Sequence, residues 1–208
     1  MQTGATQVFC TGADGFTCGF PVAAALDGRD AMLAFEMNGE PLAAKHGFPA
    51  RLIVPGLYGY VSASKWITEI KLTTWEQDVG YWVPLGWSAE APVKTQCRID
   101  VPRSGVSLDP GPTYVAGVAW APNTGISQVE VQFDNGEWHV AELSDTDIDD
   151  AWRQWRLAWT ATPGSHVIRA RATDKNGVTQ TEEPSTPAPD GARSEEHTSE
   201  LQSLRHLV

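Results

Sequence analysis

Residues 35–66 read FEMNGEPLAAKHGFPARLIVPGLYGYVSASKW, and neither a helical nor a strand period runs through the whole stretch. Asn38 and Gly39 have the chemistry of a hairpin turn, because both residues tolerate a positive φ. Prolines and glycines then interrupt the backbone on both sides of a short run, RLIV, at residues 51–54. The stretch therefore predicts short strands joined by tight turns.

Three of the four basic side chains of this stretch lie close to a backbone of small residues. His46 and Arg51 come first, and Lys65 follows the small residues 62–64. A backbone with free N–H groups can approach an anion closely, and cationic side chains add charged donors. Together these residues predict an anion-binding site. Taken singly, His46 would more simply cap a turn and Arg51 would pair with a carboxylate.

Four motifs follow one another here: EMNGEPL at residues 36–42, HGFPAR at 46–51, VPG at 54–56 and KW at 65–66. In this order and at nearly this spacing they resemble the sulfite oxidase family of molybdopterin enzymes. The ordered set makes the resemblance specific, whereas HGFP alone would not. It implies that residues 1–72, which predict alternating short strands and one short helix from Pro21, are the C-terminal part of a molybdopterin-binding α+β domain.

By this resemblance, five residues hold the pyranopterin and the phosphate of a molybdenum-molybdopterin cofactor. They are His46, Arg51, Ala63, Ser64 and Lys65. The resemblance also makes Asp14, in its Gly-x-Asp setting, a further cofactor contact. A turn aspartate that bonds its own backbone explains Asp14 equally well.

The family's molybdenum-ligating Cys lies well upstream of that turn, and only 13 residues precede Asp14 here. No metal ligand is therefore assigned, and these residues alone are expected to be inactive. Cys10 and Cys18 are expected to be buried as small apolar residues. With Cys97 they make an odd number without a CxxC pair, which favours neither a zinc site nor a disulfide framework.

Residues 73–92 predict an aromatic, poorly periodic linker. In the family the matching segment carries the active-site Tyr, and by position this is Tyr81, although Gly80 stands where the family often has Asp. A phenol near an oxo-metal centre can donate a hydrogen bond to a bound oxyanion or relay a proton. The alternative is a Tyr packed at a domain junction with its hydroxyl in water.

Residues 93–192 predict an immunoglobulin-like β-sandwich, because strand-like runs recur at short intervals with hairpin turns at Asn135-Gly136 and Asn176-Gly177. The runs cover residues 95–101, 113–120, 128–133, 138–143, 155–159 and 166–173. By resemblance this is the dimerisation domain of a homodimer, and its Trp residues belong to the core or the dimer contact. The whole chain is expected to be mainly β.

Residues 193–203 match the translation of a common sequencing-library adapter. We therefore interpret residues 193–208 as an artefactual tail, with Leu201, Leu204 and Leu207 at helix-like spacing. Such a tail was never selected to pack, so it is expected to be disordered or loosely helical and to make few contacts with the sandwich.

The net charge of −11 argues against nucleic acid as a partner, because phosphates would be repelled. No apolar run approaches the about 18 residues of a spanning helix. The leading hypothesis is a fragment of a molybdenum oxidoreductase that acts on sulfite or a similar small oxyanion. A secreted, non-catalytic sandwich that binds a partner, and a relative of methionine-sulfoxide reductase, stay open as alternatives. The electron acceptor is unknown, and an extracytoplasmic or membrane-associated parent protein is favoured.

Overall fold

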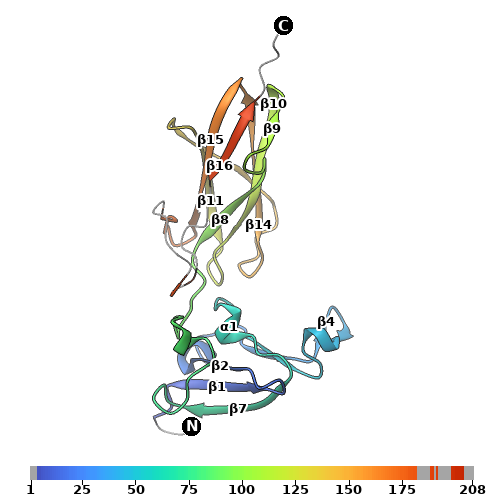
Figure 1. The fold of residues 1–208 in the computed structure, drawn as a ribbon, viewed down its shortest axis with the longest axis vertical. Helices are drawn as coiled ribbons and strands as arrows, with labels where there is room; N and C mark the ends of the chain where they lie inside the picture. The colour runs from blue at the N-terminus through green and yellow to red at the C-terminus, as the bar shows by residue number, and fades with distance from the viewer. Residues whose placement is uncertain (1–3, 182–187, 190, 192–197, 204–208) are drawn as a thin grey trace. The chain divides into compact units, whose positions relative to one another are not determined.

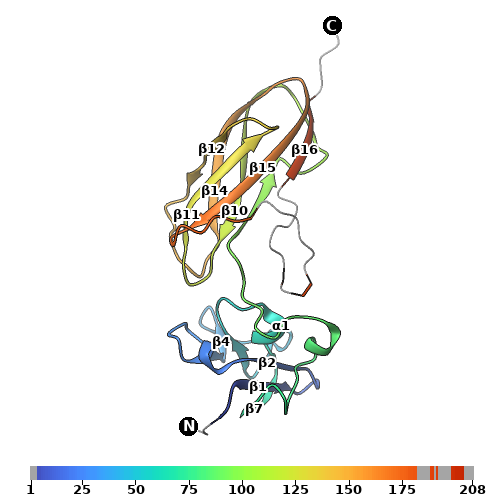
Figure 2. The same ribbon diagram turned by 90° about the vertical axis from the view of Figure 1, so that its left-hand side faces the viewer.

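The computed structural model describes residues 4–181, 188–189 and 191, and the backbone of residues 198–203. The chain forms two compact units (Figures 1 and 2). The N-terminal unit comprises Met1–Val93 and Ala188–Gly191, and the two-sheet unit comprises Lys94–Pro187 and Ala192–Val208. Most regular elements are antiparallel strands, which confirms the prediction of a mainly β chain. None of the described helices is long and apolar enough to cross a membrane.

The N-terminal unit is built on a three-stranded antiparallel sheet in the order β2-β1-β7 (Figure 1). Its strands are β1 (Gln7–Gly12), β2 (Thr17–Pro21) and β7 (Ile67–Thr73). β1 is central and almost wholly buried, and its side chains pack with those of β2 in one apolar cluster. The predicted helix after Pro21 is a single 3-10 turn, η1 (Val22–Ala25).

Two small strand pairs extend from this sheet. β3 (Met32–Ala34) pairs with β6 (Arg51–Ile53), and β4 (Glu36–Met37) pairs with β5 (Glu40–Pro41). The turn between β4 and β5 has φ of 56° at Asn38 and 77° at Gly39, which confirms the predicted hairpin. Residues 31–37 read as one strand in the sequence, but the structure divides them into β3 and β4, which pair with different partners. The remaining helical turns are η2 (Ala44–His46), α1 (Gly59–Ser62) and η3 (Val83–Leu85).

The two-sheet unit contains a four-stranded sheet, β13-β14-β10-β8, and a five-stranded sheet, β12-β11-β15-β16-β9. Side chains of both sheets share one apolar core, in which Val115, Val129 and Ile168 are fully buried. The strands are β8 (Gln96–Val101), β9 (Ser107–Leu108), β10 (Gly111–Trp120), β11 (Ile126–Phe133), β12 (Trp138–Val140), β13 (Glu142–Leu143), β14 (Arg153–Ala161), β15 (Gly164–Asp174) and β16 (Thr198–Ser203).

The predicted strand at residues 138–143 is two strands in two sheets. β12 pairs with β11, whereas β13 pairs with β14 in the other sheet. Ala141 lies between them and its amide donates to the Val129 carbonyl. A single run of alternating residues therefore crosses from one sheet to the other, which the sequence period alone does not reveal.

The expectation of a disordered or helical tail is wrong for Thr198–Ser203. These residues form β16, which pairs antiparallel with β15 and parallel with β9, and both figures draw β16 beside β15 (Figures 1 and 2). Whatever its origin, this backbone supplies N–H and C=O groups to the sheet, and sheet pairing needs no particular side chains. Residues 193–197 and 204–208 of the predicted tail lie outside the described residues.

A short strap belongs to the N-terminal unit although it follows β15 in the chain. The Ser88 amide donates to the Pro189 carbonyl at 2.8 Å. Gly191, at φ of 78°, lies so close to Tyr58 that a Cβ at this position would be 2.2 Å from the ring. Only glycine fits that contact.

His166 in β15 is held by groups on both sides of its ring. Nδ1 lies 3.0 Å from an Asp134 carboxylate oxygen, and Nε2 lies 2.9 Å from the Thr162 carbonyl oxygen. The hydrogen bond with Asp134 raises the pKa of His166 against the opposite effect of burial, and the Thr162 carbonyl adds to the rise. Nδ1 faces the Asp134 carboxylate, whereas Nε2 faces both the Thr162 carbonyl and, at 3.1 Å, the Thr162 hydroxyl, so a proton on Nε2 lets it donate to the carbonyl.

We therefore expect the free energy of unfolding to decrease as the pH rises above about 6.5, the ordinary pKa of His in an unfolded chain. The pKa of His166 is raised in the folded state. The stabilisation that protonated His166 gives is therefore complete below the pKa of the unfolded state, and it is lost as the pH rises through the pKa of the folded state. Urea unfolding at several pH values measures this slope. His166→Gln should flatten it, and an unchanged slope in that variant would contradict the assignment.

Deleting residues 198–208 should lower the thermal midpoint and cause aggregation. Without β16, residues Gly164–Arg169 of β15 lose their pairing partners and present unpaired N–H and C=O groups. Light scattering during thermal unfolding measures both effects. Leu201→Pro should mimic the deletion because proline cannot donate to the ladder, whereas Leu201→Ala keeps the backbone donor. Equal midpoints for the full and shortened chains would show that the pairing adds no stability.

Candidate functional site

Three loops of the N-terminal unit meet around residues 64–67. The Leu52 amide donates to the Ser64 carbonyl at 2.9 Å, and the Ile67 amide donates to the Ala50 carbonyl at 3.2 Å. On the other side, the Ala13 amide donates to the Trp66 carbonyl at 2.8 Å. These bonds place the predicted site residues of three separate motifs beside one another.

Gly47 brings two of the predicted cationic residues together. It ends η2 with φ of 110°, a left-handed conformation that favours glycine. A Cβ at this position would lie 3.0 Å from Arg51 Cβ and 3.2 Å from Lys65 Cβ. Arg51 and Lys65 therefore flank a glycine that leaves no room for a side chain of its own.

Gly12 has the same role on the opposite side of Lys65. A Cβ there would lie 2.7 Å from both the Lys65 carbonyl oxygen and Asp14 Oδ1, and 3.5 Å from Ser64 Oγ. Glycines at both positions thus let the backbone of Lys65 approach its neighbours. Asp14, Ser64, Lys65 and Arg51 form one contiguous group, which we call the basic cradle together with the adjoining His46.

The cationic groups of the cradle are bonded to neutral oxygens. Arg51 Nη1 donates to the His46 carbonyl at 3.3 Å, and Lys65 Nζ donates to the Lys45 carbonyl at 3.3 Å and lies 4.7 Å from the Trp66 ring centroid. Among the described residues, neither Arg51 nor Lys65 forms an ion pair. The alternative that Arg51 pairs with a carboxylate is therefore not observed, and both positive charges remain available to an anion.

Two buried polar atoms of the cradle lack a hydrogen-bond partner among the described residues. They are Ser64 Oγ, on a residue that is 0% exposed, and Arg51 Nε. A buried donor or acceptor without a partner is costly, and such groups in native proteins usually have an explanation. Both atoms are hydrogen-bond donors of the kind that an anionic ligand accepts from, which agrees with the positive charge of the cradle.

His46 and Ala63 lie at the ends of short helical turns. His46 is the last residue of η2; its amide donates to the Ala43 carbonyl at 2.8 Å, and its carbonyl accepts a hydrogen bond from Arg51. Ala63 ends α1, and its amide donates to the Gly59 carbonyl at 3.0 Å. The structure places both beside the cradle, and their contact with a cofactor stays a prediction.

Asp14 is exposed and bonds within its own turn, as the alternative interpretation expected. Its Oδ1 accepts a hydrogen bond of 3.1 Å from the Phe16 amide. This contact shapes the turn between β1 and β2 and holds Gly12 against Lys65. The described contacts of Asp14 are therefore those of a positioning residue.

Tyr81 lies next to the same turn. Its amide donates to the Thr17 carbonyl at 3.0 Å, its ring centroid is 6.1 Å from that of Phe16, and the residue is 55% exposed. A Cβ on Gly80 would be 3.2 Å from Cys18 Cα, so the smallest residue lets this segment lie against β2. The close approach explains why glycine stands where the family often has Asp.

Sequence reasoning missed the residues that hold the cradle in shape. Gly12 and Gly47 are the close-packed glycines, and the Trp66 indole N–H donates to the Ala44 carbonyl at 2.7 Å, which ties η2 to Lys65. The only available signal was the presence of glycine beside each motif. The predicted burial of Cys10 and Cys18 is confirmed. No group of three potential metal-ligating side chains occurs in the described part of the chain.

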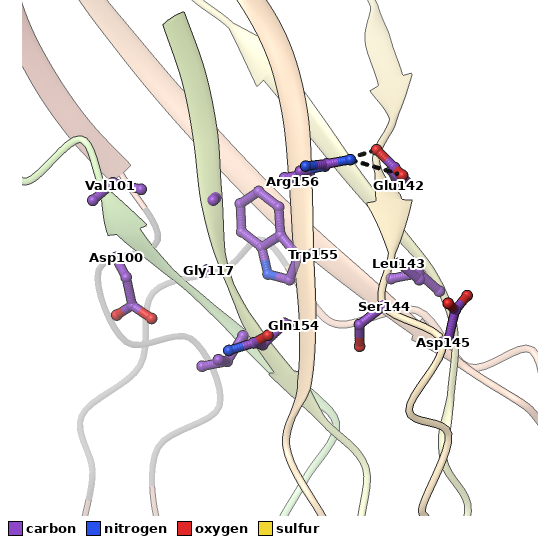
Figure 3. Close-up of a pocket in the computed structure, with 12 residues that line it drawn as sticks. Asp100, Val101, Gly117, Glu142, Leu143, Ser144, Asp145, Gln154, Trp155 and Arg156 are labelled. Carbon is purple, nitrogen blue, oxygen red and sulfur yellow. Dashed lines mark hydrogen bonds and ion pairs between the residues drawn. The ribbon is translucent and has the colours of Figure 1, made fainter.

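A pocket of about 580 Å³ lies in the two-sheet unit, away from all predicted site residues. Figure 3 shows Arg156 bonded twice to Glu142 at one end, with Gln154, Ser144 and Asp145 toward the other. Because Glu142 neutralises Arg156 and further carboxylates line the walls, this pocket does not favour an anion. The basic cradle is the better candidate site.

Comparison with known proteins agrees with the location of the cradle. Residues 1–82 match the family model described as "Oxidoreductase molybdopterin binding domain". The mitochondrial sulfite oxidase of Drosophila melanogaster is 34% identical in an alignment 179 residues long that covers 74% of this chain and 31% of that protein. The human mitochondrial sulfite oxidase is 30% identical in an alignment 161 residues long that covers 66% of this chain and 29% of that protein. The chain thus spans about a third of the length of these relatives.

The same architecture occurs in a solved structure. The crystal structure of the sulfane dehydrogenase SoxCD from Paracoccus pantotrophus aligns with a TM-score of 0.73 and 24% sequence identity. The alignment covers 95% of this chain and 55% of that chain. The likeness shows that both proteins share a fold.

Gly47→Ala should destabilise the N-terminal unit more than Gly28→Ala. Both glycines have a positive φ, but a Cβ at Gly28 would meet no atom within 4 Å, whereas at Gly47 it would press on Arg51 and Lys65. The strain of the left-handed conformation, about 1 kcal/mol, is common to both variants. The difference between their unfolding free energies in urea therefore isolates the crowding. Equal losses would show that the cradle tolerates a side chain at Gly47.

Proposed function

The chain belongs to the sulfite oxidase family of molybdopterin oxidoreductases, and on that premise we propose that the cradle holds the phosphate-bearing end of a molybdopterin cofactor. The parent protein would be a molybdenum oxidoreductase that acts on sulfite or a similar small oxyanion. The observation that carries this proposal is the pair Arg51 and Lys65, whose charges meet only carbonyl oxygens and a ring among the described residues.

The residues present fit the group on three counts. Arg51 and Lys65 supply charge-assisted donors to a phosphate, and the orphaned Ser64 hydroxyl supplies a neutral one. Gly12 and Gly47 let the loops that carry Arg51, Ser64 and Lys65 pack closely, so these donors come from adjoining segments. The His46 imidazole and the backbone at Ala63 are proposed as further contacts at the edges.

The bound molybdenum centre would supply oxygen-atom transfer and accept two electrons. The chain's own contribution is to bind and orient the cofactor from the cradle. Tyr81, exposed beside the turn that contacts the cradle, is proposed to donate a hydrogen bond from its hydroxyl to a substrate oxyanion or to move a proton there. Asp14 keeps that turn in shape.

We further propose that the two-sheet unit is an immunoglobulin-like dimerisation domain. The orders β13-β14-β10-β8 and β11-β15 correspond to the ABED and CF strands of that fold, which supports the proposal. Exposed apolar residues on the unit, among them Tyr114 and Trp152, offer surface for a second copy. Sedimentation of the full chain tests this, and a monomer at all concentrations would contradict it.

Lys65→Ala and Arg51→Ala should each weaken the binding of pyrophosphate, used as a probe of the cradle, by roughly tenfold to a hundredfold, because each removes a charge-assisted hydrogen bond. Isothermal titration calorimetry with the full chain measures the affinities. Lys71→Ala is the matched control, since it removes one positive charge of the same unit that is already paired with Asp78 at 2.7 Å.

If Lys71→Ala weakens binding as much as Lys65→Ala, the effect is general electrostatics and the cradle is not the site. The activity itself is tested on the protein encoded by the complete gene. Sulfite oxidation that is lost in Arg51→Ala, together with the loss of bound molybdenum, supports the proposal. If the complete protein reduces methionine sulfoxide and does not oxidise sulfite, its substrate is a sulfoxide and not a small oxyanion.

A further inference from the structure

Cys10 and Cys18 face each other across the β1–β2 hairpin. The antiparallel register pairs them directly, and directly opposed residues point to the same face of a sheet. Both side chains lie in the apolar cluster of the N-terminal unit, with 0% and 1% exposure, and both are free thiols. The mechanism proposed above uses neither of them.

The backbone at this pair has the spacing of a disulfide. The Val22 amide donates to the Thr6 carbonyl, and the Gly12 amide donates to the Phe16 carbonyl. These bonds mark Thr6–Val22 and Gly12–Phe16 as hydrogen-bonded pairs of the hairpin. Such pairs recur at every second residue, so Cys10–Cys18 is also a hydrogen-bonded pair, with Cα atoms about 5.5 Å apart. Disulfides usually join Cα atoms about 4.4–6.8 Å apart. The Cβ atoms of a hydrogen-bonded pair lie somewhat farther apart than the about 3.5–4.5 Å that a disulfide spans, so the bond requires a small local approach of β1 and β2.

The two thiols differ in their readiness to react. Their mutual hydrogen bond raises the pKa of Cys10, and burial raises it further. The same hydrogen bond lowers the pKa of Cys18, and a backbone hydrogen bond from Ser64 lowers it further against the effect of burial. The thiolate is the nucleophile in thiol chemistry, so Cys18 reacts first and Cys10 resolves.

Cys18 also contacts the cradle and the Tyr81 segment. Its sulfur is hydrogen-bonded to the backbone of Ser64, whose hydroxyl is one of the two orphaned atoms of the cradle. The Cys18 Cα lies against Gly80. The carbonyl of the preceding residue, Thr17, accepts a hydrogen bond from the Tyr81 amide. A change at the Cys18 sulfur is thus transmitted directly to Ser64.

We propose that Cys10 and Cys18 are a redox-modification site that a hydroperoxide converts into an intramolecular disulfide, with a change in the backbone at Ser64. The Cys18 thiolate attacks the peroxide oxygen, the O–O bond breaks, and a sulfenic acid forms with release of water. Cys10 then attacks the Cys18 sulfur, the S–O bond breaks and a second water leaves. Two thiols are oxidised and one hydrogen peroxide is reduced to two water molecules.

Access to the buried pair requires only local opening. Among the described strands, β2 is at the edge of its sheet and pairs with β1 alone. Separating this hairpin exposes both sulfurs without unfolding the unit. Hydrogen peroxide is small enough to exploit such an opening, and the reaction should be slower than that of an exposed thiolate.

The test uses the full chain treated with hydrogen peroxide and then quenched. Thiol titration after unfolding should fall from three thiols to one, and peptide mapping should find Cys10 joined to Cys18. Cys97→Ala is the matched control and should still form the link, because Cys97 lies in the other unit and burial raises the pKa of its thiol to about 12. Cys10→Ala should not form the disulfide. If Cys10→Ala folds poorly, Cys18→Ala serves as the second variant and should not form the disulfide either. Oxidation to sulfinic acid without a link would overturn the proposal.

Hydrogen exchange tests the second part. Amide exchange at Ser64 should change on oxidation of the wild-type chain and stay constant in Cys10→Ala. A disulfide that leaves exchange at Ser64 unaltered would overturn the connection to the cradle. The consequence for cofactor binding rests on the proposed function, but neither readout uses a cofactor or pyrophosphate. Failure here and failure of the cradle as a phosphate site are therefore distinguishable.

Discussion

The candidate site depends on two main-chain hydrogen bonds between residues 50–52 and residues 64–67. These bonds bring two basic residues, Arg51 and Lys65, against the same glycine, Gly47. Side-chain contacts could not do this, because no described carboxylate pairs with either group. The backbone pairing holds in place loops whose sequences favour turns. Binding residues are commonly found on loops that an ordered scaffold positions in this way.

A local positive site in a chain of net charge −11 has an energetic consequence. Among the described residues, Ser64 Oγ has no hydrogen-bond partner and no carboxylate pairs with Arg51 or Lys65. A ligand that binds only the folded state stabilises it in proportion to its concentration. On the proposed function, a bound anion would therefore stabilise the folded N-terminal unit.

Local chemistry made part of this architecture predictable. The Asn38-Gly39 hairpin follows from residues that tolerate positive φ, and β11 follows from strict alternation of apolar and polar residues. The order of the motifs identified the residues of the cradle. It did not identify the roles of Gly12 and Gly47, because their close contacts join segments that are distant in the sequence, and motif spacing does not reveal such contacts. β16 was missed for a related reason: its pairing uses backbone groups, which every sequence possesses.

The strap at Ala188–Gly191 means that the chain passes between the two units three times, at residues 93–94, 187–188 and 191–192. After one cut by a protease near Lys94, residues 1–93 would be held to the rest of the chain by the contacts of the strap with Tyr58 and Ser88. Releasing the N-terminal unit intact requires the strap to come away from Tyr58 as well. Limited digestion should therefore yield nicked protein that migrates as one species under native conditions. A shortened protein that ends at the linker near Lys94 would lack the strap, which is part of the N-terminal unit.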